Sequence, residues 1–232
     1  MPMKYADSKS PVAREAHPFF FPLLLAALAT LLLQWYAWAL LLLILALYVL
    51  WFFRNPQRTP ASASALAVIS PADGKITAIG LVPAEGFDDG QALRIAVFMS
   101  LFNVHMNWSP MSGTITSDKY FPGKFLNAMD DKAGDENERK ILHLRTTQGK
   151  NIIIKLIAGL VARRIVSPVK SGDDLKQGEK IGLIRFGSRV EVLLPSDSEL
   201  KVSLGEMVQG GHTLLAILKD SSTPIILPEN PE

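Results

Sequence analysis

The stretch KIGLIRFGSRVEVLL, residues 180–194, contains two short apolar runs, Lys180–Ile184 and Arg189–Leu194, on either side of a glycine. Runs of this length, rich in β-branched residues and bounded by glycine, are typical of β-strands. The same pattern recurs in Ala67–Ile69, Lys75–Ile79, Leu93–Met99, Ile152–Leu156, Val161–Val166 and Leu214–Leu218. Many short strands joined by glycine turns favour a mainly β fold, either a barrel or a sandwich.

Two turn segments refine this prediction. Ser70–Ile76 and Val169–Gly178 resemble the turns of barrel-sandwich hybrid domains that carry biotinyl or lipoyl groups. Neither places a lysine at a hairpin tip where such a group attaches, so the resemblance implies a fold and no function. A short helix is predicted near Phe125–Ala133. The segment Asp130–Lys140, dense in charges of both signs, is interpreted as a solvated loop.

An apolar segment precedes the β-type runs. Phe19–Phe53 is thirty-five residues long and contains no charged side chain. As one helix it would measure about 52 Å, against about 30 Å for the hydrocarbon core of a bilayer. Gln34–Trp38 interrupts it with residues that prefer the membrane–water interface. Two halves of roughly fifteen residues suit a helical hairpin that dips into one leaflet, with a single long, tilted span as the alternative.

The chain therefore divides into four parts: a polar amino-terminal segment (1–18), a membrane-associated helical segment (19–53), a linker rich in Pro, Ala and Ser (54–67) and a β-rich domain (68–232). Positive residues flank the apolar segment on both sides, which places both of its ends on the cytoplasmic face of the cell membrane. These flanking residues are Lys4, Lys9, Arg14, Arg54 and Arg58.

Composition excludes several classes of function. The net charge is only +2, so no nucleic-acid partner is predicted. The chain has no cysteine, which rules out thiol catalysis, disulfides and cysteine-bound zinc, and no metal site is predicted.

Three places could carry chemistry. Gly187-Ser188 is a turn pair in which a hydroxyl can approach a glycine carbonyl, although most such pairs are ordinary turns. His105 lies where the apolar run Leu93–Met99 gives way to a loop, a position suited to moving protons or binding phosphate near neutral pH. Asp73 precedes Gly74 in a turn, for which local hydrogen bonding is a sufficient explanation unless Asp73 lies near His105.

Four ordered blocks resemble the phosphatidylserine decarboxylase proenzyme family in its short, pyruvoyl-dependent form. They are Phe52–Pro56, Ser70–Gly74, Phe98–His105 continuing through Ser109–Gly113, and Phe186–Ser188. Tyr120–Ala128, Glu136–Arg139 and Ala162–Ile165 also look like this family, and the similarity covers roughly residues 50 to 218. Each block alone is weak, whereas the ordered set is highly specific.

The resemblance implies self-cleavage between Gly187 and Ser188. Ser188 becomes a covalent pyruvoyl group, and the products are a β chain ending at Gly187 and an α chain beginning at the former Ser188. These chains must stay associated, so strands from both should interleave. The pyruvoyl carbonyl then binds the amine of a serine head group and accepts the electrons released when CO2 leaves, giving phosphatidylethanolamine.

The resemblance also assigns residues. Ser188 matches the pyruvoyl precursor, Asp73 the aspartate of a self-processing triad, and His105 a histidine of decarboxylation. Long-form relatives have a His-x-x-His-x-Pro pattern, but here Trp108 stands at the second histidine. Either His105 serves both reactions or another group assists self-cleavage. Arg163 and Arg164 are candidates for binding a lipid phosphate, or else ordinary surface arginines.

Other functions remain as alternatives. The substrate could be a serine-headed ether lipid, or a soluble amino acid, which the apolar segment argues against. The chain could instead be a non-catalytic, membrane-anchored barrel-sandwich adaptor in which Gly187-Ser188 is merely a turn. A phospholipid and the membrane are the predicted partners, and a homo-oligomer is left open.

Overall fold

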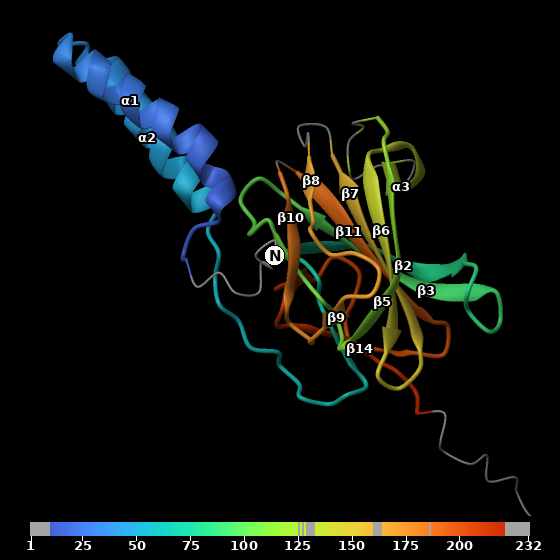
Figure 1. The fold of residues 1–232 in the computed structure, drawn as a ribbon. Coiled ribbons are helices and arrows are strands. Elements are labelled where there is room, and N and C mark those ends of the chain that lie inside the picture. The colour runs from blue at the N-terminus through green and yellow to red at the C-terminus, as the bar shows by residue number, and fades with distance from the viewer. Residues whose placement is uncertain are drawn as a thin grey trace, which may run out of the picture.

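A computed structural model describes residues 10–124, 126, 128, 133–159, 164–185 and 187–220. Two apolar helices project from a β domain (Figure 1). They are α1 (His17–Leu32), which follows the short 3-10 helix η2 (Arg14–Ala16), and α2 (Tyr36–Phe52). The chain reverses between them at Gln34, whose φ of +64° is the left-handed conformation of a tight turn. The hairpin, rather than the single long span, is thus the arrangement in the structure.

Both helices are apolar on all sides. Large side chains such as Leu25 and Leu32 are therefore exposed on their surface. The helical stretch Arg14–Leu32, 19 residues long, is long and apolar enough to cross a membrane, whereas α2 has 17 residues. At 1.5 Å per residue α2 measures about 25 Å, less than the hydrocarbon thickness of about 30 Å. The hairpin returns the chain to the side from which it left (Figure 1).

The β domain contains an eight-stranded sheet with the order β13-β2-β3-β11-β7-β6-β5-β9, all neighbours being antiparallel. Two three-stranded sheets, β1-β14-β12 and β4-β10-β8, accompany it. This mainly β architecture, with an apolar helical segment before it, confirms the predicted fold class. The strands of the large sheet are β13 (Met207–Val208), β2 (Gly74–Pro83), β3 (Gln91–Met99), β11 (Ser188–Pro195), β7 (Asn151–Ala158), β6 (Arg139–Thr146), β5 (Gly113–Phe121) and β9 (Asp174–Leu175). The small sheets comprise β1 (Ala67–Ile69), β14 (Leu214–Ile217), β12 (Glu199–Leu200), β4 (Met106–Trp108), β10 (Lys180–Ile184) and β8 (Ile165–Val166).

Strands on the two sides of Gly187-Ser188 interleave, as the sequence predicted. β11, which begins at Ser188, lies between β3 and β7 and pairs with both over most of its length. The later strands β13 and β14 pair with β2 and β1. Alternate residues of β11, Val190 and Val192 among them, enter the main apolar core. Removing the segment after Gly187 would therefore open the centre of the sheet.

A second apolar cluster joins the hairpin to the β domain. Phe52 and Phe53, at the end of α2, pack there with Met106 and Trp108 of β4 and Leu183 of β10. The rings of Phe19 and Phe53 also stack, with their centroids 5.9 Å apart. The base of the hairpin is thus continuous with the small sheet that carries β4 and β10.

Part of the charged segment Asp130–Lys140 differs from its interpretation as a solvated loop. Its described residues form the short helix α3 (Ala133–Glu136) and the start of β6, and Asn137, Glu138 and Lys140 are buried. The Lys140 ammonium donates to two backbone carbonyls and pairs with Asp118, which compensates its burial. Most of the helix predicted near Phe125–Ala133 lies outside the described residues.

Candidate active site

The loop between β10 and β11 holds Gly187 in a conformation that favours glycine. Its φ is +69°, which costs a residue with a side chain roughly 1–2 kcal/mol. The carbonyl oxygen of Gly187 packs closely against Gly159, where an added Cβ would lie 2.5 Å from that oxygen. Two glycines therefore allow the backbones of this loop and of the residue after β7 to come together.

Ser188 continues the inward-facing series of β11 and is completely buried. In the sheet register it lies between Met99 of β3 and Ala158 of β7. Its hydroxyl donates to the sulfur of Met99 at 3.2 Å. Because a thioether is a weak acceptor, little hydrogen-bond energy opposes turning this hydroxyl toward a neighbouring carbonyl carbon.

His105 faces the same loop from the segment between β3 and β4. Its Nδ1 lies 3.0 Å from the carbonyl oxygen of Asn103, and the backbone N–H of Gly187 donates to its Nε2 at 3.4 Å. These partners assign the proton to Nδ1 and leave a lone pair on Nε2. Burial is the main reason that the pKa of His105 falls from 6.5 to about 4. The imidazole is therefore neutral at physiological pH, with the Nε2 lone pair turned toward the Gly187 N–H.

The base of the hairpin forms one wall of the space beside His105. The ring of Phe52 stacks on the imidazole, and the narrow crevice beside them has no room for a water molecule. Phe53 and Arg54 line this crevice together with Leu183 of β10. The buried histidine thus lies directly against the end of the apolar hairpin.

Asp73 belongs to a separate network. Its carboxylate forms a two-point ion pair with Arg58 and accepts the backbone N–H of Gly210 at 2.8 Å. Arg58 also donates to the carbonyl oxygen of Gly210 at 2.7 Å. Within the described part of the chain, this carboxylate makes no hydrogen bond with His105 or Ser188. The structure therefore brings His105 and the cleavage loop together, whereas Asp73 is held by other partners.

Trp108, at the position of the second histidine in the long-form pattern, is part of this network. Its buried ring lies below the guanidinium of Arg58, 4.9 Å from ring centroid to Cζ. An added Cβ on Gly210 would lie 2.5 Å from the ring, so the indole fills the space over the glycine pair Gly210-Gly211. Trp108 acts as a packing surface, and the nearest imidazole to the cleavage loop is that of His105.

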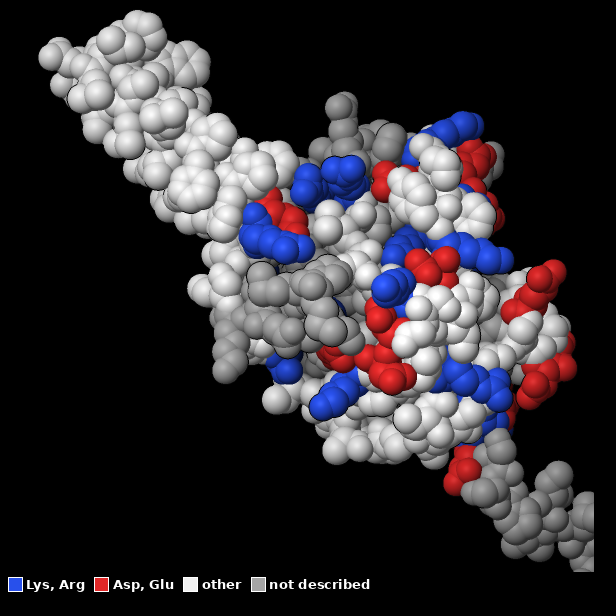
Figure 2. Space-filling view, viewed as in Figure 1, with Lys and Arg blue, Asp and Glu red and all other residues white. Residues whose placement is uncertain are grey.

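Of the two predicted phosphate-binding arginines, Arg163 lies outside the described residues. Arg164 is exposed, and its carbonyl oxygen accepts the backbone N–H of Arg185 at 3.2 Å, close to the cleavage loop. Arg185 itself lies over the ring of Phe19 at the base of α1. Cationic side chains also lie on the β domain near the base of the hairpin in Figure 2, whereas the projecting helices are uncharged in this view.

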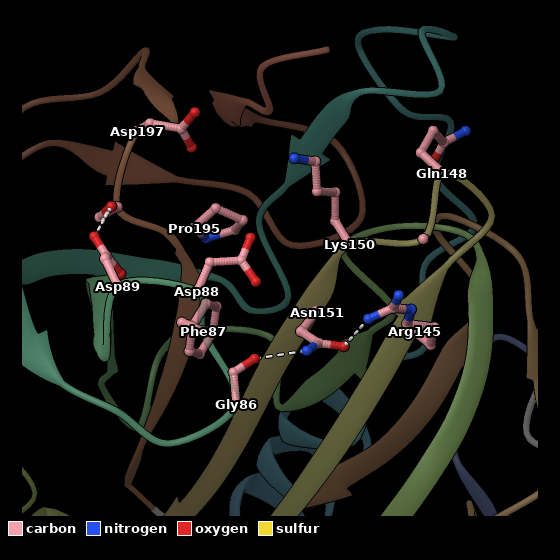
Figure 3. A pocket seen from close by; sticks show the side chains of 12 residues that line it. Gly86, Phe87, Asp88, Asp89, Arg145, Gln148, Lys150, Asn151, Pro195 and Asp197 are labelled. Carbon is pink, nitrogen blue, oxygen red and sulfur yellow. Dashed lines mark hydrogen bonds between the residues drawn. The ribbon is translucent and has the colours of Figure 1, made fainter. Parts of the chain in front are cut away.

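A larger polar depression, about 380 Å³ in volume, lies at the other end of the large sheet. Figure 3 shows Asp88, Asp89 and Asp197 around it together with Arg145 and Lys150. The register places Ser188 opposite Met99 but Pro195, which lines the depression, opposite Ala92. Seven residues of strand separate the two ends by about 23 Å. The depression is therefore not part of the site around His105.

Sequence reasoning missed several residues of this site. In the sequence Phe52 is simply the end of an apolar segment and Arg58 a positive charge that follows it. Their roles in the site could not be predicted because both contact residues far away in the sequence. The block Phe52–Pro56, which contributes to the family resemblance, is the signal that this stretch has a further role. Met99 and Gly159 carry no local pattern that distinguishes them from other core residues.

Comparison with known proteins identifies relatives that match most of the chain. A family profile described as phosphatidylserine decarboxylase matches residues 45–216. The phosphatidylserine decarboxylase proenzyme of Geotalea uraniireducens is 43% identical over 218 residues, covering 91% of this chain and 99% of that protein. The corresponding proenzymes of Burkholderia ambifaria and Symbiobacterium thermophilum are 46% and 44% identical, and each alignment covers at least 90% of this chain and 96% of the relative.

Proposed function

Since the chain belongs to the phosphatidylserine decarboxylase family, we propose that it removes CO2 from the serine head group of phosphatidylserine, using a pyruvoyl group made from its own Ser188. The observation that carries the proposal is the contact between the unprotonated Nε2 of His105 and the backbone N–H of Gly187. It supports a role for His105 as a neutral base next to Gly187, whose carbonyl carbon loses its bond to Ser188.

Self-cleavage begins when Oγ of Ser188 attacks the carbonyl carbon of Gly187. The hydroxyl proton passes to the departing nitrogen of Ser188, so the amide becomes an ester. Loss of the Cα proton of Ser188 then breaks the Cβ–Oγ bond and releases Gly187 as a carboxylate, which leaves dehydroalanine. Water adds to this residue, ammonia departs, and a ketone remains. In this scheme His105 takes the hydroxyl proton and passes it to the departing nitrogen.

The surroundings of Ser188 suit the product of these steps. Conversion turns the Cβ into a methyl group, and the present neighbours of Ser188 are the thioether of Met99 and the methyl group of Ala158. Both are compatible with an apolar group of that size. The close approach of Gly159 to the Gly187 carbonyl leaves little room for that carbonyl to move away from the attacking hydroxyl.

When formed, the pyruvoyl group supplies an electron-accepting carbonyl for the amine of the head group. The residues around it control water and protons. Phe52, Phe53 and Leu183 line a crevice that leaves no room for a water molecule, and a dry site favours loss of a carboxylate whose charge disperses as CO2 departs. We assign to His105 the delivery of a proton to the carbon that has lost CO2. Because Nε2 carries no proton at rest, it first takes this proton from solvent and then donates it.

The hairpin gives a reason for a lipid substrate. Its helices expose large apolar side chains on all sides, and α2 is shorter than the hydrocarbon core, which suits a hairpin that inserts from the cytoplasmic face and returns to it. The acyl chains of the substrate can stay in the bilayer while its head group approaches His105 from the base of the hairpin, where the packing around Phe52 has to open to admit it. After cleavage, the pairing of β11 with β3 and β7 would keep the α and β chains together.

Mass spectrometry under denaturing conditions tests the proposal. The purified protein should yield two chains that meet at Gly187 and Ser188, the second with a carbonyl-blocked amino end. Ser188→Ala should remain a single inactive chain. Ser196→Ala, which removes a hydroxyl beyond the far end of β11, is the matched control and should mature normally. A full-length wild-type chain with an intact serine would contradict the proposal and favour the adaptor.

The substrate class needs a second measurement. CO2 release should be seen with phosphatidylserine in vesicles and not with free serine or phosphoserine at the same concentration. Equal rates with the soluble compounds would point instead to a decarboxylase of soluble amino acids. A serine-headed ether lipid, assayed in parallel, separates recognition of the head group from recognition of the chains.

A further inference from the structure

The turn between β3 and β4, Ser100–Asn103, presents two apolar side chains on the surface of the β domain. Phe102 is 71% exposed and Leu101 is 39% exposed. The side chain of Asn103 accepts hydrogen bonds from the backbone N–H and the hydroxyl of Ser100, each 2.8 Å long. These bonds fix the turn locally, so the exposed ring of Phe102 is held outward by a structured backbone rather than by a loose loop.

The end of the hairpin is bound to this turn. Arg54 donates to the carbonyl oxygen of Phe102 at 2.8 Å, and the hydroxyl of Tyr48 donates to that of Leu101 at 3.3 Å. The rings of Trp51 and Phe102 lie edge to face, 6.3 Å apart. The turn and the last part of α2 therefore form one continuous surface, which contains apolar, aromatic and cationic side chains side by side.

This composition is that of a membrane interface. Trp and Tyr prefer the head-group level, and arginine binds phosphate oxygens there. The guanidinium of Arg54 lies over the ring of Trp51, 4.0 Å from its centroid, and its hydrogen bonds within the described chain go to backbone carbonyls. Its remaining N–H groups and its full charge are available to an anion. The surface is continuous with the exposed apolar side chains of the hairpin, because Tyr48 and Trp51 belong to α2.

We propose that the turn Ser100–Asn103 is a second lipid-contacting element, which enters the interfacial layer of an anionic phospholipid bilayer beside the hairpin. The proposal deepens the proposed function and rests on it for the identity of the substrate lipid. A hairpin alone would let the β domain pivot on the bilayer surface, whereas a second contact fixes its tilt. Because Phe102 precedes His105 by three residues, this contact holds the crevice at the level of the phosphate and serine groups.

The absence of cysteine from the chain makes a direct test available. Phe102→Cys is labelled with an environment-sensitive fluorophore and mixed with vesicles of phosphatidylcholine and phosphatidylglycerol, which contain no substrate. The matched control is Leu81→Cys, at a residue 58% exposed on the β2–β3 hairpin, which points away from the helices in Figure 1. Leu32→Cys, near the tip of the helical hairpin, reports insertion of the helices.

Emission from the label at residue 102 should shift to shorter wavelength and be quenched by lipids carrying a nitroxide near the head group. The label at residue 81 should remain aqueous, and the label at residue 32 should be quenched by nitroxides deeper in the acyl chains. An aqueous label at residue 102 while residue 32 is immersed would overturn the proposal. So would a blue shift that depends on protein concentration and not on vesicles, since a second copy of the chain would then cover the turn.

Kinetics give an independent readout. Phe102→Ser should raise the KM for phosphatidylserine in vesicles roughly tenfold, as expected for losing one buried apolar side chain, with kcat nearly unchanged. Leu81→Ser should change neither value. A fall in kcat at constant KM would overturn the proposal. An immersed label in a protein that never decarboxylates phosphatidylserine would remove the proposed function alone, whereas an active enzyme with an aqueous label would remove the lipid contact alone.

Discussion

The ring of Phe52 stacks on the imidazole of His105, with centroids 4.0 Å apart and planes inclined by 29°. Phe52 is the last residue of α2, so the end of the apolar hairpin forms a wall of the candidate active site. This contact removes water from the imidazole, and burial is the leading cause of the low pKa of His105. The apolar hairpin therefore influences the protonation of a residue of the candidate site.

Replacing Phe52 by alanine should raise the pKa of His105 from about 4 toward its ordinary value of 6.5, because water would reach the ring. The change also removes a fully buried aromatic side chain, at a cost of about 3–5 kcal/mol in stability. NMR titration of the imidazole, in a Ser188→Ala background that stays one chain, measures the pKa directly.

Phe52→Leu is the control for this experiment. It keeps most of the apolar volume, so its His105 should titrate near the wild-type value while losing less stability. If His105 titrates at the same low pH in the alanine variant, the stacking contact is not what keeps the imidazole dry.

The depressed pKa of His105 also predicts how stability depends on pH. The pKa of His105 is lower in the folded state than its unfolded value of 6.5. Its contribution to the free energy of unfolding is therefore fully present above pH 6.5 and is lost as the pH falls toward about 4. At pH 5 the loss is about 2 kcal/mol. Denaturant unfolding of Ser188→Ala at pH 8 and pH 5 should show this loss. The double variant Ser188→Ala with His105→Gln should lack that portion of the pH dependence. If both proteins lose the same free energy of unfolding between pH 8 and pH 5, the loss does not come from His105.

The strands of the β domain differ in how readily they could be predicted. β1 and β10 were found with their observed bounds, and most of β3, β7 and β11, because short β-branched runs between glycines specify a buried strand locally. β5 was missed because its polar residues alternate only partly with buried ones. The position of β11 between β3 and β7 arises from pairing across long sequence separations, which no local pattern reports.

The site was predictable only in part for the same reason. Gly187-Ser188 and His105 lie in ordered motifs, so a sequence comparison can find them. The partners that set their properties, Phe52 for His105 and Arg58 for Asp73, are separated from them by linker and strand, and only the folded chain brings them into contact. The proposed role of Asp73 in self-cleavage stays a prediction. Its ion pair with Arg58 and its hydrogen bond from the Gly210 N–H give it a structural role as well.

The ion pair of Arg58 and Asp73 connects the linker after the hairpin to Gly210, which would belong to the α chain. Both side chains are mostly buried, so Arg58→Ala should cost about 3–5 kcal/mol by leaving the carboxylate without its partner. The double variant Arg58→Ala with Asp73→Ala should be more stable than Arg58→Ala alone. Thermal unfolding in the Ser188→Ala background measures both.

Maturation separates the structural role of this pair from a role in chemistry. If Asp73 serves self-cleavage only by holding Gly210 and the linker, Arg58→Ala and Asp73→Ala should slow the appearance of the α chain to a similar degree. A block of cleavage in Asp73→Ala, with near-normal cleavage in Arg58→Ala, would assign the carboxylate to the reaction itself.

Gly159 offers the sharpest steric test of the cleavage geometry. A Cβ at this position would lie 2.5 Å from the carbonyl oxygen of Gly187 and 3.1 Å from the Cβ of Ala128. Gly159→Ala should therefore displace the carbonyl that Ser188 attacks and slow self-cleavage at least tenfold, a barrier increase of about 1.4 kcal/mol. Gly80→Ala is the control, since an added methyl group there meets nothing within 4 Å. Pulse-labelled chains, followed by electrophoresis as they mature, give both rates. Normal maturation of Gly159→Ala would show that the carbonyl reaches its reactive position without this glycine contact.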